Sequence, residues 1–218
     1  MGLRVWFFAA ACAALGVGAA SAQGFDIEIY GGVQGAPHST VTGVTETGVP
    51  FDFTSDWEGR SFDAPIYYGG RIMYDLDRPW SFGIEFTHAK VYASEDTLTD
   101  SGFTALEFTD GLNIITVNAE RDVRFTDRWK AYGGLGLGIA VPHVDVETPT
   151  GGDTFEFQLT GPALRWYVGG NFALTRRWSL FAEYQGTFSS NDANLDGGGD
   201  LDTDIVTNAF NLGIGFSF

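Results

Sequence analysis

Residues 205–218, with the sequence IVTNAFNLGIGFSF, alternate between two kinds of side chain. One set of alternate positions is mostly large and apolar: Val206, Asn208, Phe210, Leu212, Ile214, Phe216 and Phe218. The other set is mostly small or polar: Ile205, Thr207, Ala209, Asn211, Gly213, Gly215 and Ser217. Because successive side chains of a β-strand point to opposite faces, the stretch predicts a strand with one apolar and one small or polar face. The small face suits the interior of a narrow barrel, and the large face suits lipid.

The N-terminal residues favour a membrane barrel over the alternative of a soluble protein that ends in a strand. Residues 1–22 have the pattern of a cleaved export signal, in which Arg4 precedes an apolar run and Ala20-Ser21-Ala22 forms a cleavage site before Gln23. A transmembrane anchor is the competing interpretation, but the run is short and no stop-transfer charges follow it. We therefore expect a signal peptide over 1–22 and one barrel domain over 23–218.

The composition indicates a β-rich exported domain and limits its partners. The chain has 30 Gly, 19 Phe, 8 Tyr and 6 Trp, and its formal net charge is −16. An acidic surface repels nucleic acid and suits divalent cations, so no nucleic-acid partner is expected, and no protein partner is identifiable. The single cysteine, Cys12, lies in the predicted signal, which leaves the exported domain without a disulfide or a cysteine nucleophile.

Three short segments, 76–80, 125–129 and 174–178, divide the chain into long strands. Each is a polar turn that ends in tryptophan, and Trp80, Trp129 and Trp178 are spaced by 49 positions. Short turns beside interfacial aromatic residues are typical of the periplasmic end of an outer-membrane barrel. Counting from these turns predicts eight strands, at about 25–34, 64–76, 80–92, 111–125, 129–146, 155–174, 178–190 and 204–218. Longer polar loops are expected at 35–63, 93–110, 147–154 and 191–203.

The predicted fold class is all-β, an up-and-down, eight-stranded antiparallel transmembrane β-barrel preceded by a cleaved signal peptide. Eight strands enclose a lumen that side chains fill, so an open pore is not expected. The inward positions also carry Glu28, Arg124 and Gln185, and the predicted lumen network consists of Arg71, Glu85, Glu120, Arg165 and Glu183. Charges in a dry lumen must be paired and hydrogen-bonded, so these residues predict a polar plug that holds the barrel together. A proton or ion path through them is the alternative.

Candidate chemical groups gather at the outward ends of two predicted strands. Alternation places His88, Lys90 and Tyr92 on the lipid side of the third strand, near the outer headgroups. His143 and Asp145 share a face at the end of the fifth strand, where a ring nitrogen and a carboxylate could hold a divalent metal ion. An ordinary rim of amphipathic and charged side chains is the alternative. No flavin or nicotinamide site is visible in the sequence.

The last predicted loop, 191–203, alternates Asp with Asn, Gly and Leu. A flexible loop of carboxylates is plausible for Ca²⁺, although the spacing does not match the twelve-residue EF-hand loop. A solvated acidic loop is the alternative. Nucleophilic catalysis has weak support, because the sequence contains no G-x-S-x-G elbow.

Several segments are similar to the lipid A oxidase family of α-proteobacteria, among them IEFTHAKVY (84–92), LEFTDGLN (106–113), AVPHVDV (140–146), QLTGPA (158–163) and residues 183–208. The resemblance covers most of residues 23–218. It implies a small outer-membrane barrel that oxidises the proximal glucosamine of lipid A to 2-aminogluconate with molecular oxygen, aided by divalent cations. The partners would then be lipopolysaccharide and other outer-membrane lipids.

Under this resemblance, the rim residues acquire candidate roles. The roles are catalytic for His88, His143 and Glu107, metal-binding for His143 and Asp145, and substrate-binding for Lys90 and Tyr92. Oxidation at the anomeric carbon needs a base for the hydroxyl proton and an acceptor for a hydride equivalent, for which a bound redox metal is the simplest choice. Two alternatives stay open: a non-enzymatic barrel that stabilises the membrane or adheres through its acidic loops, and a lipid A deacylase.

Overall fold

The structure of the protein, a computed structural model, describes residues 24–76 and 79–218. The expected signal peptide over 1–22 lies outside the described residues and stays a prediction. No helix in the described ranges is long and apolar enough to cross a membrane. The elements, in chain order, are β1 (Phe25–Gly35), β2 (Ser39–Val44), β3 (Pro50–Ser55), β4 (Trp57–Glu58), β5 (Tyr68–Asp75), β6 (Trp80–Ala93), α1 (Glu95–Ser101), β7 (Ala105–Arg124), β8 (Trp129–Ala140), β9 (His143–Glu147), β10 (Asp153–Phe157), β11 (Gly161–Ala173), β12 (Trp178–Leu195) and β13 (Gly199–Ser217).

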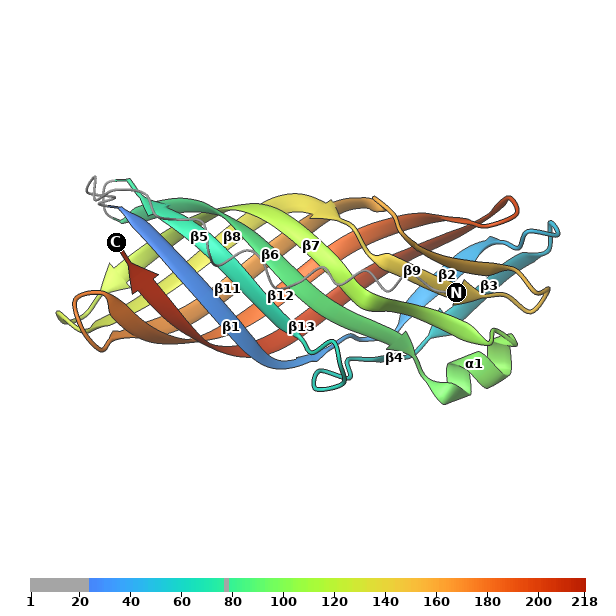
Figure 1. The fold of residues 1–218 in the computed structure, drawn as a ribbon, viewed down its shortest axis with the longest axis horizontal. Helices are drawn as coiled ribbons and strands as arrows, with labels where there is room; N and C mark the ends of the chain where they lie inside the picture. Colours follow the sequence, from blue (N-terminus) through green and yellow to red (C-terminus); the bar gives the residue numbers. More distant parts are fainter. Residues whose placement is uncertain (1–23, 77–78) are drawn as a thin grey trace, which may run out of the picture.

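Eight long strands close into a barrel, which confirms the predicted fold (Figure 1). Their order around the ring is β7-β8-β11-β12-β13-β1-β5-β6, and β6 pairs with β7 to complete it. Every neighbouring pair is antiparallel. The strands run obliquely to the long axis, because a closed sheet requires its strands to tilt. The pairing of β13 with β1 joins the last strand to the first and leaves the barrel without a free edge.

The two faces of β13 separate as its alternation predicts. Ala209 and Asn211 point into the barrel and are buried, whereas the intervening Phe210 is 68% exposed and Leu212 is 72% exposed. The other barrel strands show the same division, and their exposed apolar side chains form a belt that includes Ile29, Ile84, Val117, Leu135, Leu137 and Val168. A belt of this kind around a closed barrel is the surface that a bilayer covers.

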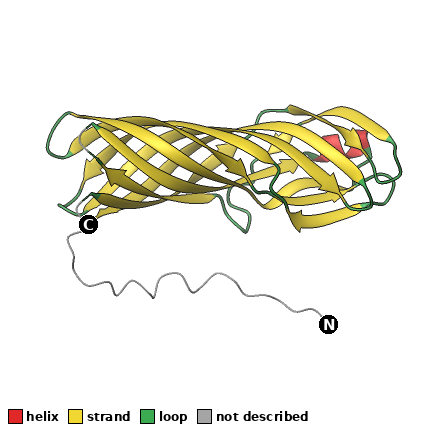
Figure 2. Ribbon diagram, turned by 90° about the horizontal axis from the view of Figure 1, so that it is seen from above, coloured by secondary structure: helices red, strands yellow, loops and turns green. Residues whose placement is uncertain are grey.

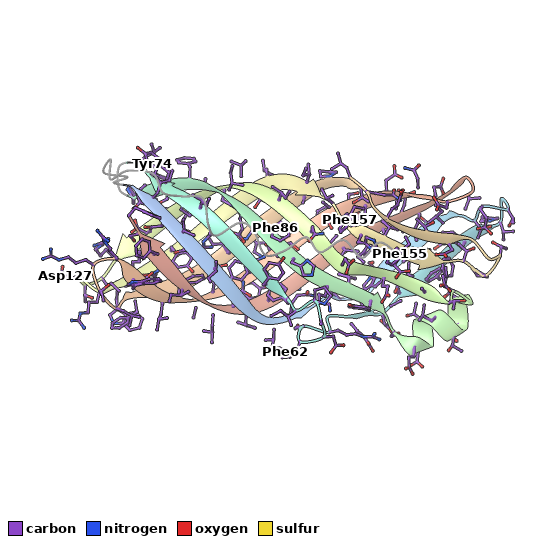
Figure 3. The ribbon with its side chains drawn as sticks, in the orientation of Figure 1. Phe62, Tyr74, Phe86, Asp127, Phe155 and Phe157 are labelled. Carbon is purple, nitrogen blue, oxygen red and sulfur yellow. The ribbon has the colours of Figure 1, made fainter. Side chains whose placement is uncertain are left out.

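The short turns at 125–129 and 174–178 lie together at one end of the barrel, which we call the turn end (Figures 1 and 3). In both of them a threonine hydroxyl accepts hydrogen bonds from the backbone of the closing residues, with Thr126 capping Trp129 and Thr175 capping Trp178. Trp129 packs on Phe172 with the ring centres 4.7 Å apart. These contacts orient the aromatic side chains around the edge of the belt, where amphipathic rings are favoured.

The opposite end is a folded extension (Figure 2). The predicted loop at 147–154 is confirmed as the connection between β9 and β10, but the prediction of long loops in the other three ranges was wrong. The range 35–63 contains β2, β3 and β4, the range 93–110 contains α1 and the start of β7, and the range 191–203 is a hairpin of β12 and β13. In that hairpin Ala193, Leu195 and Leu201 are buried while the intervening Asp residues face outward. The alternation of Asp with Leu was therefore a strand pattern rather than the flexible loop expected for a cation.

A bend in β7 marks the boundary between the barrel and the extension. Gly111 has φ +94°, a left-handed conformation that favours glycine, and it lies directly over the ring of His88. At the same point the β6–β7 register shifts, so that residues 109–111 lie opposite Lys90 alone. Beyond this bulge the outer part of β7 stays paired with β6 and also pairs with β9, which places Glu107 opposite Asp145.

Candidate functional site

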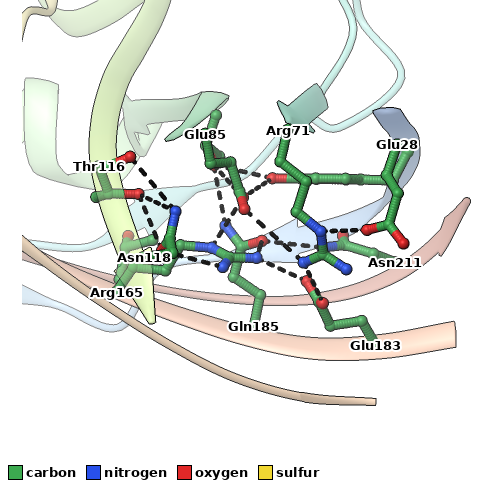
Figure 4. A network of polar contacts seen from close by, with 12 residues as sticks. Glu28, Arg71, Glu85, Thr116, Asn118, Arg165, Glu183, Gln185 and Asn211 are labelled. Carbon is green, nitrogen blue, oxygen red and sulfur yellow. Dashed lines mark hydrogen bonds and ion pairs between the residues drawn. The ribbon is translucent and has the colours of Figure 1, made fainter. Parts of the chain in front are cut away.

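A network of charged side chains fills the centre of the lumen (Figure 4). Arg71 on β5 forms ion pairs with Glu28 on β1 and with Glu183 on β12, the latter at 2.7 Å. Arg165 on β11 lies 2.8 Å from both Glu85 on β6 and Glu183. Two of these bridges, Arg71–Glu183 and Arg165–Glu85, join strands that are not neighbours, so they cross the lumen.

Neutral side chains complete the network. The hydroxyl of Tyr30 donates to Glu85 at 2.6 Å, and Arg165 also donates to the amide oxygen of Gln185 at 3.1 Å. The guanidinium of Arg165 lies 3.8 Å from the ring centre of Tyr167. Glu120, the fifth residue expected in the plug, is buried in the lumen but forms no ion pair within 4 Å of a described residue. This packing leaves the centre of the barrel filled with paired charge.

A second polar group lies on the outer face of the extension. Strand pairing places Glu58, Tyr92, Glu107, Asp145 and Phe155 side by side on β4, β6, β7, β9 and β10. The sequence neighbours of Tyr92, Glu107 and Asp145 are buried and apolar, and Glu58 and Phe155 are paired with Tyr92 and Asp145, so these five side chains share the outward face. We call this set the rim row.

The centre of the rim row is a pair of carboxyl groups outside the membrane-facing belt. Glu107 and Asp145 are directly opposite on paired strands and both are partly buried. Burial, and then the charge of Asp145, raises the pKa of Glu107 to about 7. Burial also raises the pKa of Asp145, against the lowering effect of nearby His143. Like charges on adjacent positions favour sharing one proton, so the pair can accept or release a proton near neutral pH.

Two cations lie beside the row, but only one is accessible. Arg60 forms an ion pair with Glu58 at 2.8 Å and lies 4.7 Å from the ring centre of Tyr92. Lys90 faces outward, as alternation predicts, yet it has no exposed surface because the segment 59–67 covers it. Its Nζ donates to the backbone oxygen of Asp63 at 2.7 Å. The outward position of Lys90 follows the expected parity, but a segment remote in sequence covers the side chain.

Both candidate histidines are buried on the outer surface. The ring of His88 stacks on Tyr68 with the centres 5.0 Å apart, and its Nδ1 is 2.9 Å from Asn113 Oδ1. His143 is enclosed by Phe155 and Phe157, whose ring centres are 4.3 and 4.7 Å away. Each ring has one buried nitrogen without a hydrogen-bond partner among the described residues, Nε2 of His88 and Nδ1 of His143.

The structure brings some of the expected site residues together and separates others. Tyr92, Glu107 and Asp145 are adjacent in the rim row, and His143 lies two residues before Asp145 on the same face. His88 is four residues before Tyr92 on β6, about 13 Å along an extended strand. Across residues 24–76 and 79–218, no three His, Cys, Asp or Glu side chains gather as a metal site.

Sequence reasoning missed several residues of the site. The alternation Phe155-Glu156-Phe157 could have indicated an outward aromatic pair, but it was interpreted only as the start of a barrel strand. Arg60 reaches the row from a segment that carries no local pattern, so only the tertiary structure shows its place. Asn113 and Tyr68 likewise contact His88 through strand pairing.

Comparisons with known proteins agree with this architecture. The sequence profile of the outer membrane protein beta-barrel domain matches residues 7–218. No curated protein matches the chain in sequence. Among solved structures, Neisserial surface protein A is similar with a TM-score of 0.51 and 17% identity, covering 90% of this chain and 98% of that one. The outer membrane protein OprG from Pseudomonas aeruginosa is similar with a TM-score of 0.51 and 13% identity, covering 90% and 96%. At these identities the likeness concerns the fold alone.

Proposed function

The chain belongs to the family of the outer membrane protein beta-barrel domain, and from this premise we propose that it oxidises the proximal glucosamine of lipid A. The observation that carries the proposal is the outward carboxyl pair of Glu107 and Asp145, in which the pKa of Glu107 is raised to about 7. A carboxylate of that pKa is a suitable general base at neutral pH. The resemblance of the segments that contain both residues to lipid A oxidases supports the same reaction.

The position of the rim row is compatible with a lipid substrate. In outer-membrane barrels the short turns face the periplasm, so the extension faces the outside of the cell. The edge of the extension that joins the barrel then meets the outer leaflet. Phe155 in the row is 63% exposed, and Phe157, two residues further along β10, is 57% exposed (Figure 3). Exposed aromatic side chains next to carboxylates and Arg60 provide both apolar and polar contacts, as the boundary between acyl chains and sugars requires.

The proposed reaction has two steps. In the first, the carboxylate of Glu107 takes the proton of the anomeric hydroxyl while the anomeric C–H bond transfers a hydride equivalent to molecular oxygen, which with one proton becomes hydrogen peroxide. The sugar becomes a lactone, oxidised by two electrons. In the second step, water adds to the lactone carbonyl, the ring C–O bond breaks, and 2-aminogluconate forms. The net change is a gain of one oxygen atom, about 16 mass units.

The divalent metal implied by the resemblance does not fit the described residues well. His143 and Asp145 would supply one nitrogen and one carboxylate, and no third described ligand joins them. Metal centres that activate substrates usually have three or more protein ligands. The reaction above therefore uses the residues of this chain for binding and proton transfer and passes no step through a metal.

A non-enzymatic barrel is the second candidate, and the burial of two candidate residues favours it. Lys90 holds the segment 59–67 through Asp63, and His88 is packed between Tyr68 and Asn113. Such contacts are also what a purely structural polar cluster provides. In that case the extension would act as a rigid outward surface, and the carboxyl pair would be one of its many acidic features.

Mass spectrometry of lipid A separates the two functions. Lipid A would be isolated from Gram-negative cells that make the protein, grown with and without oxygen, and compared with an empty vector. We expect an oxygen-dependent gain of about 16 mass units on the proximal sugar, absent with Glu107→Gln and kept with Glu147→Gln, a neighbouring outward carboxylate on β9. Loss of an acyl chain would instead identify a deacylase. If lipid A is unchanged although the barrel is folded in the membrane, the result would favour the non-enzymatic barrel.

A further inference from the structure

Two apolar hollows meet on the belt, and together they extend from the outward end of β1 toward the turn end. One, of about 620 Å³, is lined by side chains that include Val33, Phe62, Tyr184, Phe210 and Leu212. The other, of about 560 Å³, is bounded by Ile29, Tyr68, Leu180, Leu212 and Ile214. Gly31 and Leu212 line both hollows, so they form one continuous furrow across β12, β13, β1 and β5.

The furrow exists because Gly31 lacks a side chain at an outward position. Gly31 pairs with Leu212 on one side and with Tyr68 on the other, and both of these side chains face outward. A Cβ at Gly31 would meet nothing closer than the backbone oxygen of Tyr67 at 3.6 Å, an ordinary contact. The backbone therefore does not require glycine here, in contrast to Gly32, where a Cβ would collide with the backbone of Phe210.

An aromatic side chain projects over the outward end of the furrow. Phe62 belongs to the segment 59–67, which leaves β4 and returns to β5, and it is 75% exposed (Figure 3). The backbone of this segment is fixed by Ser61, whose hydroxyl accepts a hydrogen bond from Gln34 N at 2.8 Å and donates to Gln34 O at 3.1 Å. Phe62 thus lies over a wall that is otherwise apolar and continuous with the membrane-facing belt.

We propose that this furrow holds one acyl chain of lipid A from the outer leaflet. The walls are apolar, the surface is continuous with the belt that the membrane covers, and Gly31 and Val33 lie toward the outward end of β1. Leu212, Gly31, Tyr68 and His88 are in register across three strand pairs, so Tyr68, which lines the second hollow, lies next to the buried His88. The inference depends on the outer-membrane location and not on the oxidation proposed above.

Site-directed photocrosslinking tests the proposal. The photoreactive residue p-benzoylphenylalanine would replace Leu212 in the furrow or, as a matched control, Leu137 on β8, which is 71% exposed against 72% for Leu212. The full barrel would be placed in phosphatidylethanolamine vesicles that contain lipopolysaccharide and then irradiated. We expect a lipopolysaccharide adduct several-fold stronger from position 212 than from position 137. Equal adducts at both positions, or adducts with phosphatidylethanolamine alone, would overturn the proposal.

A second substitution shows whether the furrow itself causes the difference. Gly31→Leu fills the furrow, whereas Gly170→Leu adds the same side chain on β11, where a Cβ has 4.0 Å of space. We expect Gly31→Leu to reduce the adduct at position 212 to the level of position 137, and Gly170→Leu to leave it unchanged. Heat-dependent migration on gels confirms that each variant is folded. A full adduct in folded Gly31→Leu contradicts the inference, while a loss of lipid A oxidation alone does not affect it.

Discussion

Arg165 shows how strongly the stability of the barrel depends on the ion pairs of a single residue. Its side chain is fully buried and compensates Glu85 and Glu183 at once. Replacing it by methionine keeps much of the volume but leaves two buried carboxylates with less compensation, which costs about 3–5 kcal/mol. We expect Arg165→Met to lower the urea midpoint of unfolding in vesicles. The double variant Arg165→Met/Glu85→Gln should recover part of this loss, and an equal midpoint for Arg165→Met and the native protein would contradict the plug.

The raised pKa of Glu107 predicts the pH dependence of the proposed oxidation. The base form exists above the pKa, so the rate should rise with pH through about 7. Asp145→Asn removes a neighbouring negative charge that raises this pKa, and the rising limb should move to lower pH. Rates of lipid A oxidation in detergent, measured from pH 5 to 9, check both statements. If the rate of oxidation rises over the same pH range in the native protein and in Asp145→Asn, Glu107 is not the titrating base.

The same group predicts a pH effect on stability that needs no activity. Folding raises the pKa of Glu107 from its ordinary value of 4.5 to about 7, so the folded protein binds the proton more tightly than the unfolded chain. Stability from this group is therefore present below about pH 4.5 and is lost as pH rises to 7. Glu107→Gln should unfold at a higher urea concentration than the native protein at pH 8, and the difference should shrink toward pH 5. Glu147→Gln serves as the control.

At the scale of elements, the bend in β7 links the barrel to the rim row. Gly111→Ala and Gly151→Ala both force a side chain into a left-handed backbone, because both glycines have φ +94°. Each should cost about 1–2 kcal/mol for that reason. Only at Gly111 would the added Cβ also collide with the ring of His88, since nothing lies within 4 Å at Gly151. We expect the ring signals of His88 in NMR spectra to shift in Gly111→Ala alone; equal shifts in both variants would contradict this geometry.

Element by element, alternation predicted the barrel strands well because lipid and lumen impose opposite polarity on successive residues. Val206 to Phe216 on β13 and Ile84 on β6 have the exposure that their parity indicates. The extension was missed because its strands, such as the Asp-rich part of β12, are bounded by glycines and carry acidic side chains on a solvent face. The burial of Lys90 has no local signal at all, since it depends on Asp63, which is 27 residues away in sequence.

At the scale of the whole molecule, charge is divided between the two ends. Arg121, Arg124, Arg128, Lys130, Arg176 and Arg177 lie at or near the turn end, whereas the described part of the extension contains only two cations, Arg60 and Lys90. The extension also carries outward carboxylates such as Asp192 and Asp202, which are paired across β12 and β13. Between the two ends, the cross-lumen bridges close the barrel. The charged side chains of the lumen are buried, so the accessible charges of the described residues lie at the two ends of the molecule and outside the lumen.

The closed lumen gives the last prediction, which concerns transport. Arg165 and Glu85 have essentially no exposed surface, and the bridges Arg71–Glu183 and Arg165–Glu85 cross the lumen between strands that are not neighbours. A path for hydrated ions would require these pairs to separate in a region of low dielectric, at a cost of several kcal/mol. In planar bilayers we expect no steady conductance above the background of lipid alone, with a porin in the same bilayer as the positive control. Heat-dependent gel migration of the reconstituted sample verifies folding, and discrete channel openings from the folded native protein would show that the charged network is a gate instead of a plug.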